Sequence, residues 1–254
     1  CSSDLVELLR RSRDVCPNAV RMLLTGYSDL AAIVGSINEG EVYRFISKPW
    51  ENDKLLSTVA EAATIGLELA DAVNTAVELP PHMNAGVLVV DADDELYRVV
   101  GGLVSGLCPV FYAADVEGAL AVMHAHEVAV MLADVDAAHE QLRMLLALLK
   151  QEHPEILSVV ATRASDSELV IGLINKAQIF RFLNKPVNVR MLNSHVRTAL
   201  QRYLAYQRSP QLLATQRVSA ATEARASALG QRILEGVKAL PARWFTRVGA
   251  DSST

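Results

Sequence analysis

Residues 159–187 read VVATRASDSELVIGLINKAQIFRFLNKPV, and residues 23–50 read LLTGYSDLAAIVGSINEGEVYRFISKPW. The two stretches belong to one gapless alignment, in which residues 16–62 match residues 153–199 at an offset of 137. Identical pairs at this offset include Thr25/Thr162, Asn38/Asn175, Arg44/Arg181, Phe45/Phe182 and Lys48/Lys185. An offset of this length far exceeds the period of a solenoid repeat, so the pattern indicates two copies of one domain.

The second copy alternates short apolar runs with amphipathic segments of helical length. Strands are expected at residues 86–91, 109–112, 128–133, 156–161 and 179–183. Helices are expected between and after them, the last two at 165–176 and 187–206. Strands that alternate with helices over short loops predict an α/β fold with a doubly wound parallel sheet. We expect the flavodoxin-like arrangement, a five-stranded sheet of order 2-1-3-4-5.

The first copy contains only the last part of this pattern. Within residues 1–78, strands are expected at 19–24 and 42–46, and no sequence corresponds to the three strands that would precede them. We therefore interpret 1–78 as the C-terminal part of a truncated domain, whose remainder we expect upstream of the given sequence. A proline pair marks 79–85 as a linker to the complete domain at 86–206.

Residues 207–254 follow the second copy and lie outside the repeat. Leu229, Ile233, Val237 and Leu240 are spaced as on one face of a helix. Two interpretations stay open for this segment. It is a helical tail that packs on its own domain or binds a partner, or it is a linker to an absent output domain.

The composition narrows the class of protein. The chain has 254 residues, of which 51% are hydrophobic, and its net charge of −5 gives no indication of a nucleic-acid partner. No apolar run approaches the length of a membrane span. The three cysteines form no disulfide framework or metal motif, so we expect a reducing, cytoplasmic setting. The six histidines show no ligand spacing and are expected at the surface or in loops.

Side chains suited to a phosphoryl group follow four of the expected strands. In chain order they are Asp91 and Asp93, Asp134, Thr162 and Lys185. We expect them to meet, because the carboxyl ends of parallel strands lie at one edge of a sheet, where ligands bind. Carboxylates that hold Mg²⁺, with a hydroxyl and an ammonium group for the phosphoryl oxygens, are what a phosphoryl-accepting aspartate requires.

Together these motifs resemble the receiver domains of response regulators in two-component signalling. VLVVDADDEL at 87–96 is similar to the first strand and acidic pair of that family, and VMLADVD at 130–136 to the strand that carries its phosphoacceptor. The two Lys-Pro stretches quoted first are the most specific to the family. The second copy thus resembles a complete receiver of CheY-like fold, and the first resembles the C-terminal half of another.

The resemblance implies a role for each residue of the site. In the second copy, Asp134 corresponds to the phosphoacceptor, Thr162 to the switch hydroxyl and Lys185 to the phosphoryl-binding lysine. Phe182 corresponds to an aromatic switch residue. The first copy matches three of these roles through its own set, Thr25, Phe45 and Lys48, and its acceptor would precede the first residue.

The resemblance also implies a magnesium ion held by Asp91, Asp93 and Asp134. The chain departs from the family pattern at two places near these residues. The acidic pair after the first strand reads Asp91-Ala92, and the loop 135–138 lacks the usual Met-Pro. These departures bear on how well the second copy would bind the ion.

The function implied is that of a response regulator in a phosphorelay. Its partner would be a histidine kinase or a phosphotransfer protein, and its own chemistry would be limited to self-phosphorylation and autodephosphorylation. The signal would change the face formed by the fourth helix, fifth strand and fifth helix, residues 165–206, and would reach an output domain or a homodimer partner.

An alternative from another class stays open. Ala92 and the loop 135–138 are compatible with a degenerate pseudo-receiver, which would serve as a docking or dimerisation module without phosphorylation. A flavodoxin-like enzyme with a bound nucleotide is disfavoured, because the expected first strand is followed by acidic residues and not by a glycine-rich loop.

Overall fold

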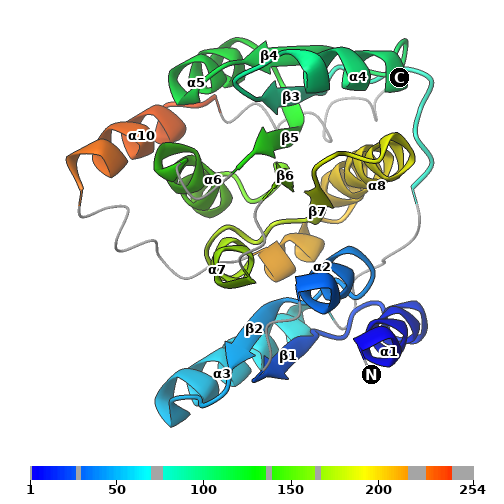
Figure 1. Cartoon of the computed structure of the whole chain (residues 1–254), viewed down its shortest axis with the longest axis vertical. Coiled ribbons are helices and arrows are strands. Elements are labelled where there is room, and N and C mark those ends of the chain that lie inside the picture. Colours follow the sequence, from blue (N-terminus) through cyan, green and yellow to red (C-terminus); the bar gives the residue numbers. More distant parts are fainter. Residues whose placement is uncertain are drawn as a thin grey trace, which may run out of the picture.

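The structure, a computed structural model, describes residues 2–26, 30–69, 77–135, 139–163, 167–216 and 227–241. It contains a parallel sheet of five strands and another of two, which belong to the second and first copies of the repeat (Figure 1).

The five-stranded sheet has the predicted strand order. Its strands are β3 (Gly86–Val90), β4 (Val110–Ala113), β5 (Val128–Asp134), β6 (Leu157–Thr162) and β7 (Arg181–Asn184). All neighbours are parallel in the order β4-β3-β5-β6-β7, which is 2-1-3-4-5 when counted along this copy. The predicted fold class is therefore confirmed. β3 and β6 are buried at every residue, because helices cover both faces of the sheet.

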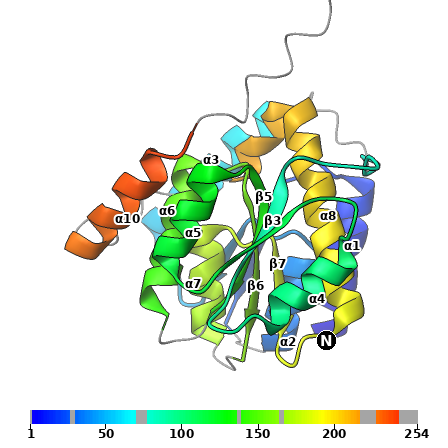
Figure 2. The same ribbon diagram turned by 90° about the horizontal axis from the view of Figure 1, so that it is seen from above.

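The helices of the second copy form the two outer layers. They are α4 (Glu95–Leu103), α5 (Val116–Ala125), α6 (Glu140–Glu152), α7 (Ser167–Ala177) and α8 (Val189–Arg208). Seen from above, α4 and α8 lie on one side of the sheet, and α5, α6 and α7 lie on the other (Figure 2).

The first copy is built from the last elements of the same fold. It consists of α1 (Ser2–Val15), β1 (Met22–Thr25), α2 (Leu30–Asn38), β2 (Arg44–Ser47) and α3 (Asn52–Leu69). Among the described residues β1 pairs with β2 only. Its helix α2 packs on β7 and α7, and α7 packs in turn on β2 (Figure 1). The first copy thus covers the edge of the complete sheet at which β7 lies.

The segment after α8 folds back onto the chain. A 3-10 helix, η1 (Pro210–Gln216), touches both α8 and α3, and α10 (Ala228–Lys238) packs on α6. Ile233, Val237 and Leu240 are buried there, so this part of the apolar stripe packs on its own domain. Residues 217–226 and 242–254 of the predicted tail lie outside the described residues. Within the described residues, every helix is too short or too polar to cross a bilayer.

The expectation that all histidines lie at the surface or in loops is wrong for His195. Its side chain is buried within α8 at 8% exposure, and Nδ1 makes no hydrogen bond to any described residue. The sequence does not show whether a single histidine on a helix faces the core or the solvent. Burial, helped by the charge of Arg181, lowers the pKa of His195 to about 4.

Gly86 is a position where the fold has no room for a side chain. A Cβ atom there would lie 2.5 Å from the carbonyl oxygen of Pro109 and 2.6 Å from the Phe111 ring. We expect Gly86→Ala to lower the free energy of unfolding by about 1–3 kcal/mol. Gly102→Ala is the control, because Gly102 is exposed on α4 and a Cβ atom there would meet no atom within 4 Å. Its free energy of unfolding should rise by about 0.5–1 kcal/mol. Urea unfolding measures both, and equal stabilities would contradict the packing at Gly86.

His195 should make the protein sensitive to acid. Its pKa in the unfolded chain is near the ordinary 6.5, so between pH 6.5 and 4 the unfolded state binds the extra proton. The contribution of neutral His195 to the free energy of unfolding is fully present above pH 6.5. It falls by up to roughly 3 kcal/mol as the pH drops to 4. We expect His195→Leu to remove this part of the decline in urea titrations. The exposed His82 offers the control, since His82→Leu should keep the wild-type profile.

Candidate functional site

The ammonium group of Lys185 lies between two carboxylates at one edge of the sheet. Its Nζ donates to Oδ2 of Asp134 at 2.5 Å and to Oδ2 of Asp91 at 3.4 Å. The side chains of Lys185 and Asp91 are 13% and 3% exposed, and that of Asp134 is 22% exposed. Three residues from distant parts of the chain thus meet at the predicted place.

The parallel register explains why they meet. β5 ends at Asp134, which is paired with Ala161, and β6 ends one residue later at Thr162. The amide of Lys185 then donates to the carbonyl of Thr162 at 2.8 Å, which extends the ladder between β6 and β7 by one bond. Strand ends in register place their next side chains on the same edge of the sheet.

The electrostatics of Lys185 follow from this geometry. Burial by itself favours the neutral amine, but the hydrogen bond and charge of Asp134, with the charge of Asp91, outweigh it and raise the pKa of Lys185. The lysine therefore stays cationic and offsets the repulsion between two carboxylates.

Asp93 and Ala92 follow Asp91 directly, and the backbone amide of Asp93 donates to Oδ1 of Asp91 at 3.3 Å. Both are exposed, and Oδ1 of Asp93 accepts the amide of Glu95 at the start of α4. Among the described residues, no three histidine, cysteine, aspartate or glutamate side chains lie close enough together to hold one metal ion. Mg²⁺ typically takes one or two protein carboxylates together with water and phosphate oxygens. Asp91 and Asp134 fit that requirement, while a ligand role for Asp93 stays a prediction.

Thr162 and Phe182 are buried in the two strands that lead to the site. Thr162 is 1% exposed at the end of β6, and Phe182 is fully buried in β7. The backbone of Phe182 is also held from outside the second copy, because Oδ1 of Asn38 accepts its amide at 2.8 Å. The assigned switch roles of both residues stay predictions.

The first copy repeats part of the framework of the site. The amide of Lys48 donates to the carbonyl of Thr25 at 2.8 Å, as Lys185 does to Thr162. Phe45 is buried, as its counterpart Phe182 is. Lys48 is exposed and forms no ion pair within the described part of the chain.

A cleft opens beside the two carboxylates. It is lined by Asp91 and Asp134, by His139 and Glu140 at the start of α6, and by Leu229 of α10. The tail helix therefore begins next to the candidate phosphoacceptor. The sequence showed the apolar stripe that contains Leu229 but gave no sign of which surface the stripe would meet.

The sequence interpretation missed a group of polar residues between the two copies. Asn38 and Asn175, at equivalent positions, each bind the backbone of the other copy, and Glu41 pairs with Arg181 and Arg202. The recurrence of the two asparagines at the repeat offset was a usable signal. It identified equivalent residues but did not show that they lie at a contact.

The chain matches curated proteins over a short part of its length. No protein-family model matches it. It is 42% identical over 60 residues to the hydrogenase transcriptional regulatory protein HoxA of Bradyrhizobium diazoefficiens, and 40% identical over 57 residues to HoxA of Cupriavidus necator. These matches cover 24% and 22% of this chain, which spans only 12% of the length of each relative.

Solved structures similar to this chain include receiver domains. One is the signal receiver domain of an HD domain-containing protein from Pseudomonas fluorescens, with 24% identity, a TM-score of 0.46, and coverage of 54% of this chain and 98% of that structure. Another is a response regulator from Thermotoga maritima, with 18% identity, a TM-score of 0.42, and coverage of 46% and 98%. The strand order of the five-stranded sheet, β4-β3-β5-β6-β7, is the order that the resemblance to receiver domains implies.

The raised pKa of Lys185 should depend mainly on Asp134. We expect Asp134→Asn to lower the pKa of Lys185, and Asp91→Asn to lower it less, because the Asp91 carboxylate lies farther from Nζ. The control Asp93→Asn should leave the pKa of Lys185 unchanged, since the Asp93 carboxylate accepts the amide of Glu95 instead. An NMR titration of ¹³C-labelled lysine ε-carbons measures each pKa. An unchanged value in Asp134→Asn would refute the ion pair.

Proposed function

We propose that the second copy is a phosphoryl-accepting receiver of a response regulator, with Asp134 as the acceptor. The observation that supports this best is the position of Lys185, whose ammonium group touches Asp134 and Asp91 together. A cation at this point is placed to bind the oxygens of a phosphoryl group attached to Asp134.

The proposed reaction moves a phosphoryl group from a phosphohistidine to a carboxylate. An oxygen of Asp134 donates an electron pair to phosphorus, the P–N bond of the donor breaks, and its electron pair returns to the imidazole. The product is an acyl phosphate on Asp134. Lys185 binds one phosphoryl oxygen, and the hydroxyl of Thr162 is assigned to another.

A magnesium ion belongs to this proposal. Asp91 and Asp134 would hold it, and it would neutralise negative charge on the phosphoryl oxygens. The chain's own contribution is to keep these two carboxylates at one edge of the sheet, beside the open cleft through which a donor would enter.

The partners follow from the same chemistry. The donor would be a histidine kinase or a phosphotransfer protein in the cytoplasm, and the chain would act as a signalling component, not as an enzyme on a separate substrate. The HoxA relatives are named as transcriptional regulators of hydrogenase, and they extend far beyond the matched segment. An output activity of that kind would reside outside the residues described.

A second candidate is a pseudo-receiver that docks proteins without phosphorylation. The exposed Ala92 supplies no carboxylate beside Asp91, and the carboxylate of Asp93 is occupied at the start of α4. Under this alternative the pair Lys185–Asp134 is purely structural, and the chain binds partners in one state only.

Phosphorylation by a small donor separates the two candidates. With acetyl phosphate and Mg²⁺, the intact mass should rise by one phosphoryl group, and Asp134→Asn should abolish the gain. Asp115→Asn is a matched control, because Asp115 lines the same cleft but caps α5 through the amide of Gly118, so labelling should persist. Removal of Mg²⁺ by a chelator should stop the reaction. An unmodified wild-type mass under saturating donor would rule out the receiver proposal and favour the pseudo-receiver.

A further inference from the structure

The two copies of the repeat hold each other by a reciprocal pair of amide clamps. Asn38 donates from Nδ2 to the carbonyl of Phe182 at 2.9 Å and accepts the amide of Phe182 at 2.8 Å. Asn175 does the same to Phe45, donating at 2.9 Å and accepting at 3.0 Å. Asn38 and Asn175 are equivalent in the repeat, as are Phe45 and Phe182. The joint between the copies therefore has the pattern of a two-fold interface within one chain.

The surroundings of the clamps repeat this symmetry. Arg44 lies over the ring of Tyr43 at 4.3 Å, and its counterpart Arg181 lies over the ring of Phe180 at 4.0 Å. The turn before each of these strands contains a non-glycine residue with positive φ, Glu41 at 50° and its counterpart Gln178 at 46°. Each asparagine carboxamide binds only the backbone N–H and C=O of a strand edge, and these groups are the same in both copies. The clamps alone cannot tell one copy from the other.

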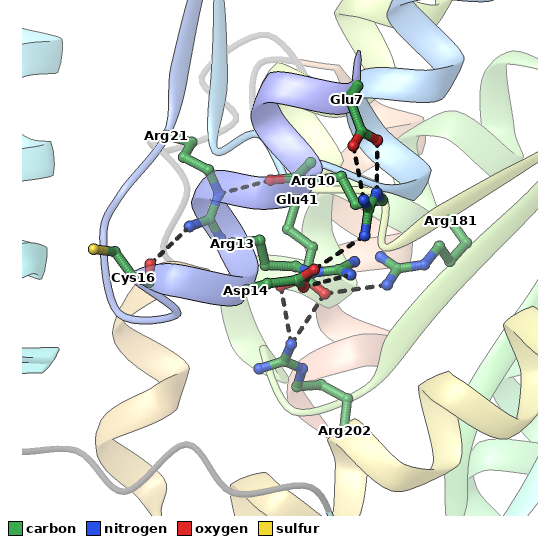
Figure 3. Close-up of polar contacts among 10 residues, drawn as sticks. Glu7, Arg10, Arg13, Asp14, Cys16, Arg21, Glu41, Arg181 and Arg202 are labelled. Atoms are coloured by element: carbon green, nitrogen blue, oxygen red, sulfur yellow. Dashed lines mark hydrogen bonds and ion pairs between the residues drawn. The ribbon is translucent and has the colours of Figure 1, made fainter. Parts of the chain in front are cut away.

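The symmetry is broken at two positions that carry charge. Glu41 of the first copy accepts from Arg181 at 3.1 Å and from Arg202 at 3.0 and 2.9 Å, as the close-up shows (Figure 3). On the other side of the joint, Gln178 accepts from Arg44 and donates to the carbonyl of Tyr43 at 3.1 Å. The counterpart of Glu41 is thus neutral.

Arg202 has no cationic counterpart either. The equivalent position in the first copy is occupied by Ile65, which is 1% exposed. The side chains of Arg181 and Arg202 are only 4% and 20% exposed, so their charges need a nearby carboxylate. Burial would favour the neutral acid of Glu41, but the charges of Arg202 and Arg181 outweigh it and lower its pKa to about 2.

We infer that Glu41 and Arg202 make the face formed by α7, β7 and α8 of the second copy bind a first copy and not another second copy. Two second copies, paired through the same clamps, would set the neutral Gln178 in the place of Glu41, against Arg181 and Arg202. Two first copies would set Glu41 against Arg44 and the apolar Ile65. Of the two pairings that involve the second copy, only the unlike one places a carboxylate beside Arg181 and Arg202.

Charge reversal and rescue test this selection in the full chain. Glu41→Lys and Arg202→Glu should each open the joint. Hydrogen exchange at the amides of Phe45 and Phe182 should then rise by at least about tenfold, since each depends on an asparagine of the other copy. The double variant places the acid at position 202 and the new cation at position 41, so the two charges again attract each other. Its exchange rates at both amides should return to within about threefold of wild type. A double variant that exchanges as fast as the faster single variant would overturn the inference.

Two controls separate a specific joint from general damage. Glu39→Lys makes the same change of charge at an exposed neighbour and should leave both amides at the wild-type rate. The milder Glu41→Gln should accelerate both amides while exchange in β3 stays slow, which shows that the second copy remains folded. Wild-type exchange in Glu41→Gln would refute a role for the carboxylate.

Sedimentation velocity tests the exclusion of like pairs. Glu41→Lys exposes the face of the second copy, yet it should form no more dimer than the wild type, because Gln178 offers no charge to Arg181 and Arg202. A concentration-dependent dimer in which the amide of Phe182 regains its protection would show that like pairs are tolerated. That result would defeat the proposed selection.

Discussion

Lys185 joins three parts of the chain that are far apart in sequence, and the candidate site depends on that single cation. Asp91 follows β3, Asp134 ends β5 and Lys185 follows β7, so the parallel order of the strands is what brings them together. Two carboxylates that contact one ammonium group would repel each other without that cation. The fold therefore supplies both the charges and the group that balances them.

Much of this arrangement could be predicted, because it follows from local patterns. Apolar runs of strand length identified all five strands, and the rule that ligand groups gather at the carboxyl ends placed Asp134 and Lys185 on one edge. The placement of Asp93 could not be derived in this way. Its carboxylate accepts the amide of Glu95, and such a local contact between a side chain and the backbone is not predicted by the strand pattern.

The joint between the copies was beyond sequence reasoning for a different reason. Identity at the repeat offset marks residues that occupy equivalent places in two folds, and it says nothing of how the folds lie against each other. Asn38 and Asn175 were identical, and this is equally expected of residues that support each copy separately. The informative positions were the ones where the copies differ, Glu41 against Gln178 and Arg202 against Ile65. The effect of these two differences can be worked out only when the contact between the copies is known.

The site and the joint share one short strand. β7 has four residues, and its second, Phe182, is held at both backbone polar groups by Asn38 of the first copy. The residue after the strand is Lys185, which is drawn toward Asp134 and Asp91. A strand of this length has little freedom to absorb movement at one end without moving the other, since close-packed interiors transmit strain. The contacts to the carboxylates and the contacts to the first copy therefore act on one strand and the residue that follows it.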